Sequence, residues 1–155
     1  MAAADSLHPQ QFNYRGNHQP GEGGSPLHAL DGTFHDVYTS PEYYTHESGE
    51  SRADQEAVGA MRAARGKPNL PVTIYRAAPH GVTQINPGDW VTTSRSYAQS
   101  HARHATDPAQ DMPVYSARVP ASHIRDGGND ILEFGYHGSK PVNVKTQLPP
   151  KKGWA

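Results

Sequence analysis

The sequence contains no cysteine among its 155 residues. This absence excludes a disulfide scaffold, a thiolate zinc site and a cysteine nucleophile, so that only His and carboxylate side chains could bind a metal. No segment approaches the roughly 18 apolar residues of a membrane-spanning helix, and the N-terminal MAAADSLHPQ has no secretory-signal pattern. We expect a soluble protein that is cytoplasmic, or that is delivered into a host cell by a route the sequence does not show.

Apolar residues are also scarce. The hydrophobic fraction is 34%, while the chain contains 15 Gly and 14 Pro. This composition predicts one domain with a modest core and many turns, and it disfavours a bundle of long helices. The formal net charge of -1 is far from the strongly basic balance of a nucleic-acid-binding protein.

Residues 1–50 differ in composition from the rest of the chain. They are rich in Gly, Pro, His, Ser and Tyr and have no lasting period of 2 or 3.6 residues. We predict a long N-terminal arm, extended and packed on a body formed by residues 51–155, because its aromatic residues are too many for a free linker. Arg15 and His18 of this arm could either reach a functional site or only attach the arm to the body.

The body reads as a mostly β unit with two helices, which places the chain in the α+β class. The first helix is predicted over residues 51–65, where Ser51 can cap the N-terminus and Asp54 lies at the third helical position. A second helix is predicted directly after Ser94, over residues 95–105. Strands are predicted at 72–78, 89–94, 113–119, 130–136 and 140–146.

Three polar features stand at the ends or edges of these predicted strands. They are Arg76 in IYRA, the hydroxyl triplet Thr92-Thr93-Ser94 in WVTTSRSYA, and Glu133 in DILEFGY. Taken singly, each has an ordinary explanation: a partly solvated arginine, a strand that ends in a helix cap, and a glutamate on the exposed face of a strand. Their order along the chain suggests more than these separate explanations.

This order resembles that of the R-S-E class of mono-ADP-ribosyltransferases, the cholera-toxin-like and clostridial C3-like group. The resemblance covers about residues 72–146. Arg76 matches the first-strand arginine, Thr92-Thr93-Ser94 matches the Ser-Thr-Ser triplet, and Glu133 matches the final Glu of the E/Q-x-E motif. Ile131 departs from the pattern, because the family has Glu or Gln there.

The resemblance implies a two-sheet β core with a cleft for NAD, and a toxin-like effector that transfers ADP-ribose and releases nicotinamide. Glu133 would stabilise the positive charge that develops on the ribose, and a hydroxyl from Thr92 would hold the Glu133 carboxylate. Arg76 would bind the pyrophosphate. NAD would also contact Thr92, Thr93, Ser94 and Tyr97, although Tyr97 could instead serve only to pack its helix on the sheet. No metal is required.

The acceptor of the ADP-ribose is not identified by the sequence. In the family, the loop before the final Glu selects the acceptor, and here that loop is 123–130. Arginine acceptors are disfavoured because Ile131 supplies no carboxylate, and because strand alternation would turn Asp130 to the face opposite Glu133. A protein, nucleic-acid or small-molecule acceptor stays open. So do two alternatives: an NAD glycohydrolase with water as acceptor, and a non-catalytic binding module on the same scaffold.

A metal site is the weakest of the candidate functions. His101 and His104 lie three residues apart in the predicted second helix and could both ligate a metal ion. No third ligand lies nearby in the sequence, however, and ten histidines in one chain make such a spacing unremarkable. We therefore predict no metal in the site.

Overall fold

The computed structural model describes residues 24–147, and its first long helix is the one that the sequence predicts. This helix, α1, runs over Arg52–Ala64, and the hydroxyl of Ser51 accepts a hydrogen bond from the backbone N–H of Asp54 at its N-terminus. The predicted cap is thus confirmed. The apolar stripe of α1 packs into the core through Ala57, Met61 and Ala64, which are buried.

Within residues 24–147, all strand pairs are antiparallel and form three small sheets. The first sheet has the order β1–β4–β8, with bounds Pro71–Ala77, Val114–Pro120 and Lys145–Gln147. The second has the order β3–β6–β5, with bounds Trp90–Val91, Phe134–Tyr136 and Ile124–Asp126. The third pairs β2 (Gln84–Ile85) with β7 (Val142–Asn143). With the helices, these sheets confirm the predicted α+β class.

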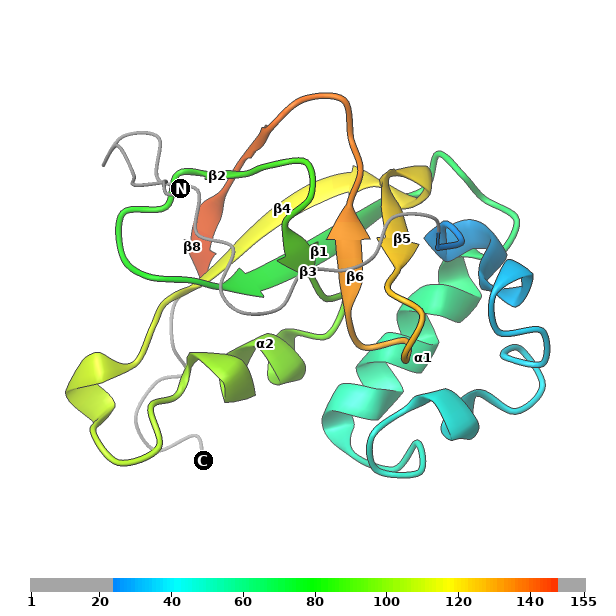
Figure 1. Cartoon of the computed structure of the whole chain (residues 1–155), viewed down its shortest axis with the longest axis horizontal. Coiled ribbons are helices and arrows are strands. Elements are labelled where there is room, and N and C mark those ends of the chain that lie inside the picture. The colour runs from blue at the N-terminus through cyan, green and yellow to red at the C-terminus, as the bar shows by residue number, and fades with distance from the viewer. Residues whose placement is uncertain (1–23, 148–155) are drawn as a thin grey trace.

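The second helix, α2 (Arg95–Ala102), follows the strand β3. Ser94 caps it by accepting a hydrogen bond from the N–H of Tyr97, as the sequence predicts, but the helix ends three residues before the predicted position 105. Both helices lie on the lower side of the strands in Figure 1. Four short 3₁₀ helices complete the described fold: η2 (Leu27–Gly32), η3 (Pro41–Tyr44), η4 (Pro108–Gln110) and η5 (Ala121–His123).

Residues 24–50 do not form the extended segment that we predicted for the arm. They fold into η2, η3 and turns, and lie beside α1 (Figure 1). Leu27, Leu30, Phe34 and Val37 are buried in the same cluster as the apolar face of α1. This segment has no lasting period because its apolar residues are fixed by tertiary packing rather than by one regular helix or strand. Arg15 and His18 lie outside the described residues.

Two predicted strands are shorter than expected. The segment 89–94 is strand only over Trp90–Val91, and the segment 130–136 is strand only over Phe134–Tyr136. In the second case the cause is local: Asp130 Oδ1 accepts hydrogen bonds from the N–H groups of Leu132 and Glu133, at 2.8 and 3.1 Å. This Asx-type turn replaces the sheet ladder with side-chain acceptors, so that Glu133 stands just before β6.

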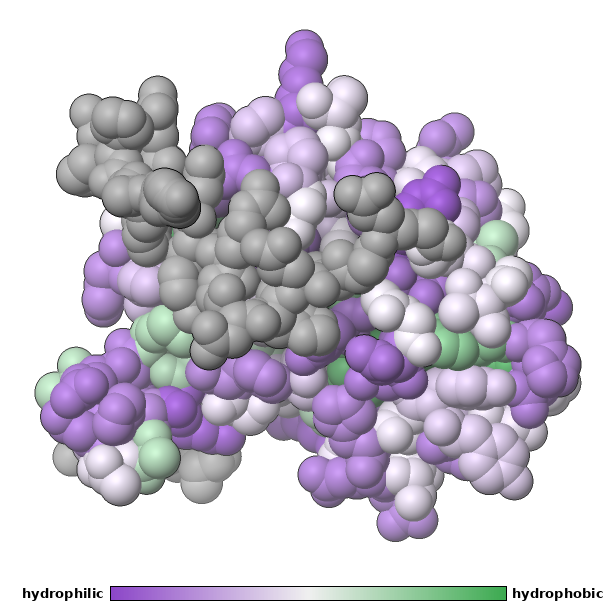
Figure 2. Space-filling model, viewed as in Figure 1, coloured by the Kyte–Doolittle hydropathy of each residue, from purple (hydrophilic) through white to green (hydrophobic). Residues whose placement is uncertain are grey.

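The visible face of the molecule is mostly polar. Figure 2 shows purple and white over most of the described surface, with only small green areas. Among the described residues, Tyr43 is the one large hydrophobic side chain that is fully exposed, at 74%. None of the helices within residues 24–147 has the length and apolar character needed to cross a membrane.

Candidate functional site

The three sequence-predicted features lie on neighbouring strands. Tyr75 and Thr92 exchange both backbone hydrogen bonds, at 2.8 and 2.9 Å, which places β1 with Arg76 beside the end of β3. On the other side, β3 pairs with β6 through Trp90–Gly135 and Val91–Phe134, so that Thr92 directly follows the paired part of β3 and Glu133 directly precedes that of β6. The strand-end arginine, the hydroxyl triplet and the glutamate are therefore neighbours in the fold, although 57 residues separate the first from the last in the sequence.

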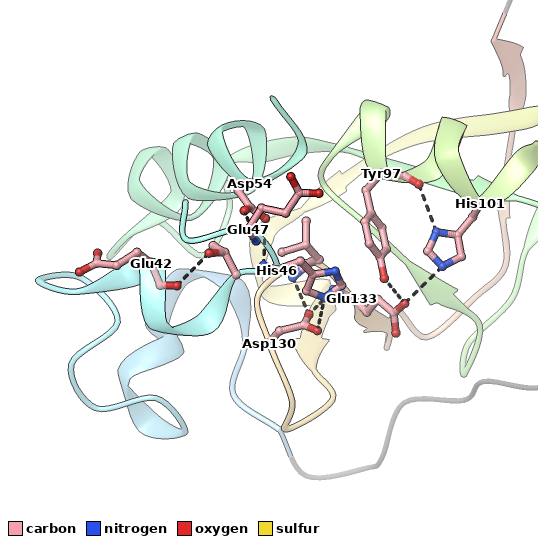
Figure 3. Close-up of polar contacts among 10 residues, drawn as sticks. Glu42, His46, Glu47, Asp54, Tyr97, His101, Asp130 and Glu133 are labelled. Carbon is pink, nitrogen blue, oxygen red and sulfur yellow. Dashed lines mark hydrogen bonds and ion pairs between the residues drawn. The ribbon is translucent and has the colours of Figure 1, made fainter. Parts of the chain in front are cut away.

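Glu133 is held by side chains from α2. The hydroxyl of Tyr97 donates a hydrogen bond to Glu133 Oε2 at 2.5 Å, and His101 Nε2 lies 3.9 Å from the same oxygen. The Glu133 side chain is 19% exposed, so that its carboxylate is oriented and can still be reached from solvent. Figure 3 shows Tyr97 and His101 extending from α2 toward Glu133. Glu133 is therefore a carboxylate that is held in one orientation and is still partly exposed to solvent.

The Tyr97 phenol remains protonated in this environment. Burial raises its pKa, and the hydrogen bond to Glu133 and the negative charges of Glu133 and Asp130 raise it further. The protonated hydroxyl therefore acts as a hydrogen-bond donor to Glu133. Aromatic rings surround it: His101 and His46 have ring centroids 4.4 and 5.3 Å from that of Tyr97.

The predicted hydroxyl triplet is buried and has three different environments. Thr92 Oγ1 accepts a hydrogen bond from Ser94 N–H at 3.0 Å, and within the described residues no hydrogen bond joins it to Glu133. The hydroxyl that holds the carboxylate is therefore the phenol of Tyr97, not that of Thr92. Thr93 Oγ1 is buried and has no hydrogen-bond partner in residues 24–147, although a buried hydroxyl normally has one.

The side chain of Ser94 is buried and stabilises the start of α2. Its hydroxyl caps α2 and also donates to Glu56 Oε1 at 2.9 Å. Glu56, on α1, further accepts hydrogen bonds from the N–H and the hydroxyl of Ser96, at 2.9 and 3.1 Å. A carboxylate at the N-terminus of a helix is stabilised by the free N–H groups and by the helix dipole. Sequence reasoning missed Glu56, because nothing in the helical period of α1 distinguishes it from other surface glutamates.

Arg76 lies on the buried face of β1, as its shared alternation with Val72 and Ile74 predicts. It is 1% exposed. One guanidinium nitrogen donates a hydrogen bond to the carbonyl oxygen of Trp90 at 2.8 Å, and the group lies 5.7 Å from the centroid of the Trp90 ring. The site thus has a fixed positive charge directly beside β3.

Asp130 lies near Glu133 in the chain and occupies a turn, not the regular strand that we predicted there. The prediction assumed a regular strand, whereas the turn at 130–133 brings the Asp130 side chain to the Glu133 N–H. Its other carboxylate oxygen, Oδ2, lies 2.8 Å from His46 Nε2. Ile131 is buried in the core, so that the acidic side chain next to Glu133 in this turn is that of Asp130.

His46 is the second site residue that the sequence did not reveal. It comes from the segment before α1, which the sequence pattern left without structure. Its position depends on Asp54, a buried carboxylate that accepts hydrogen bonds from the N–H groups of His46, Glu47 and Gly49. Asp54 is the residue from which the position of this segment could have been predicted, because an acidic residue in the first turn of a capped helix can bind the backbone N–H groups that precede it.

The pair of histidines considered as metal ligands is not assembled. His104 lies beyond the end of α2, where its Nδ1 accepts hydrogen bonds from the N–H groups of Thr106 and Asp107. Within residues 24–147, no group of three or more His, Asp or Glu side chains is arranged to hold a metal ion. Comparisons of the chain with protein-family models, with curated proteins and with solved structures found no match.

Proposed function

We propose that this protein transfers ADP-ribose from NAD to an acceptor and releases nicotinamide. The observation that carries the proposal is the Glu133 carboxylate, which Tyr97 anchors at 2.5 Å while 19% of the side chain stays exposed. Glu133 comes directly before β6, which pairs with β3, and Thr92 directly after β3 is bridged to Tyr75, the neighbour of Arg76 in β1. The proposal extends to the fold, in which the sheets β1–β4–β8 and β3–β6–β5 would form the two halves of an NAD-binding core.

The chemistry suits a fixed carboxylate. When the bond between nicotinamide and ribose breaks, positive charge develops on the ribose and is greatest in the transition state. A preorganised anion stabilises that charge more than it stabilises the ground state, which is the condition for catalysis. Glu133 can also accept a hydrogen bond from the ribose 2′-hydroxyl. Because Tyr97 already fixes its orientation, little reorganisation is needed during the reaction.

Three further groups support NAD as the substrate. Arg76 supplies a fixed cation for the pyrophosphate, and a guanidinium binds such groups through two parallel hydrogen bonds. Thr93 supplies a buried hydroxyl that has no partner within the described residues, so that a ligand polar atom would satisfy it. The rings of Tyr97 and His101, with centroids 4.4 Å apart, form an aromatic wall beside Glu133 against which the nicotinamide could pack.

The first test measures nicotinamide released from NAD by the full chain. We expect release by the wild type, and a reduction of at least about 100-fold in Glu133→Gln with NAD binding retained, because a preorganised transition-state charge contributes roughly 2.7 to 4 kcal/mol. Glu50→Gln is the matched control, since Glu50 is exposed and has no side-chain hydrogen bond or ion pair within the described residues. No release by the wild type would refute the proposal and favour a non-catalytic binding module.

The second test identifies the acceptor by following labelled ADP-ribose. Free ADP-ribose as the only product would make the protein an NAD glycohydrolase, and label on an added acceptor would make it a transferase. Agmatine and polyarginine are the informative small acceptors, because Asp130 now stands where a guanidinium partner could be needed. Nucleic acid and a mixed protein extract complete the set.

A further inference from the structure

A histidine–carboxylate pair stands next to the Glu133 site. His46 Nε2 lies 2.8 Å from Asp130 Oδ2, with side-chain exposures of 43% and 18%. Asp130 Oδ1 at the same time accepts the N–H of Glu133 at 3.1 Å, so that one carboxylate joins the histidine to the backbone of the proposed catalytic residue. Figure 3 shows His46, Asp130 and Tyr97 gathered around Glu133.

The pair is held in place by two sets of hydrogen bonds. The backbone of His46 is fixed by Asp54, whose two oxygens accept the N–H groups of residues 46, 47 and 49. The turn that carries Asp130 is tied to the same segment, because Ile131 N–H donates to the carbonyl oxygen of Tyr44 at 3.0 Å. The backbone of His46 and the turn that carries its partner Asp130 are therefore both fixed, although 43% of the His46 side chain is exposed.

The protonation pattern of the neutral imidazole follows from these contacts. Asp130 can only accept at Oδ2, so that the ring hydrogen lies on Nε2 and the lone pair lies on Nδ1. Within residues 24–147, Nδ1 of His46 makes no hydrogen bond. His101, the other histidine of the site, differs: its Nδ1 lies 3.2 Å from the carbonyl oxygen of Tyr97, and its Nε2 faces Glu133. His46 is therefore the histidine with a basic nitrogen available to a second substrate.

We propose that His46, oriented by Asp130, is the base that deprotonates the acceptor of the ADP-ribose. This inference rests on the proposed function. The acceptor X–H forms a bond from X to C1′ of the NAD ribose, the C1′–N bond breaks with its electron pair leaving on nicotinamide, and the proton passes from X to His46 Nδ1. Asp130 then stabilises the imidazolium, and the proton is released to solvent. Acceptors that carry a removable proton, such as water, a hydroxyl or an amine, are the class that this pair would serve.

The test compares acceptors that must lose a proton with acceptors that have none to lose. Water is the first kind; 3-acetylpyridine and azide are the second, and each would replace nicotinamide on C1′ directly. General-base catalysis typically contributes about 10²- to 10⁴-fold. We therefore expect His46→Ala to lower hydrolysis of NAD by at least about 100-fold while exchange with 3-acetylpyridine and azide is unchanged. His80→Ala is the control, because His80 is also an exposed histidine, in the turn after β1, and has no side-chain hydrogen bond or ion pair within the described residues.

Asp130→Asn gives a second, independent variant. Its Oδ1 can keep the bonds to the N–H groups of the turn, whereas an amide NH₂ facing Nε2 would move the ring hydrogen to Nδ1 and remove the basic lone pair. It should therefore lose hydrolysis and keep exchange, like His46→Ala. His101→Ala should reduce both reactions equally, because it acts through Glu133.

The outcomes separate the two proposals. If the wild type releases no nicotinamide with any of the three acceptors, the proposed function itself fails. If the wild type is active but His46→Ala keeps full hydrolysis, or loses hydrolysis and exchange to the same extent, then His46 is not the base. A selective loss of hydrolysis in both His46→Ala and Asp130→Asn is the result that supports the inference.

Discussion

Replacing Tyr97 by Phe removes one oxygen from the site and leaves the ring in place. The phenol donates a hydrogen bond to Glu133 Oε2 at 2.5 Å. The ring itself packs between His46 and His101 and is 7% exposed, so that phenylalanine should occupy the same space. The change therefore tests whether orienting the carboxylate matters, separately from whether its charge matters.

The expected loss can be worked from this single contact. A hydrogen bond to a charged acceptor contributes about 1.5 to 3 kcal/mol. Water can partly replace the phenol, because the Glu133 side chain is 19% exposed, and the lower end of that range applies. About 1.5 kcal/mol corresponds to roughly a tenfold decrease in kcat for nicotinamide release. NAD binding should change little, since the hydrogen bond acts on the carboxylate rather than on the dinucleotide.

The assay is steady-state nicotinamide release, with NAD affinity measured separately by calorimetry. Tyr43→Phe is the matched control, because it makes the same chemical change on a ring that is 74% exposed. Circular dichroism and thermal unfolding would show that both variants are folded. Turnover in Tyr97→Phe equal to that of the wild type, or an equal loss in Tyr43→Phe, would refute the reasoning.

Three further results are expected. Arg76→Lys should weaken NAD binding in calorimetry, because lysine keeps the charge but cannot form two parallel hydrogen bonds; equal affinity would remove Arg76 from the binding site. Asp54→Ala should lower the free energy of unfolding by about 3 kcal/mol in urea titrations, because buried N–H groups lose their acceptor; a loss below that of the surface control Glu50→Gln would contradict this. Burial raises the pKa of Tyr97 and Tyr115, so the stability that depends on their protons is complete below the ordinary pKa of 10.0 and falls as pH rises above it; Tyr97→Phe should make this alkaline decline less steep.

Local signals predicted the parts of the fold that local interactions determine. The helix α1 has its cap at Ser51, and β1 alternates so that Arg76 falls on the buried face. Ser94 caps α2 as its sequence position indicates. In each case the deciding contact lies within a few residues along the chain, or follows from the period of one element. The proximity of Arg76, Thr92 and Glu133 was expected from the family resemblance and is present in the strand order.

The remaining parts depend on contacts between distant segments. His46 reaches Asp130 across 84 residues, and no pattern in the sequence connects these two positions. Regular alternation over 130–136 was the wrong assumption, because Asp130 accepts backbone N–H groups that a strand would have used. Two adjacent glycines followed by Asn129 and Asp130 are turn-forming residues, and giving them more weight would have shortened the predicted strand.

The two carboxylates near the start of α1 have a consequence for how the molecule opens. Asp54 binds the segment that carries His46. Glu56, two residues further along α1, binds the start of α2, the helix that carries Tyr97. The two side chains that hold the His46 segment and the start of α2, Asp54 and Glu56, therefore lie in a single turn of α1. Amide hydrogens at the 46–49 segment and at the N-terminus of α2 should exchange with solvent at a common rate, set by the fraying of that turn, because segments that share their anchors open as one cooperative unit.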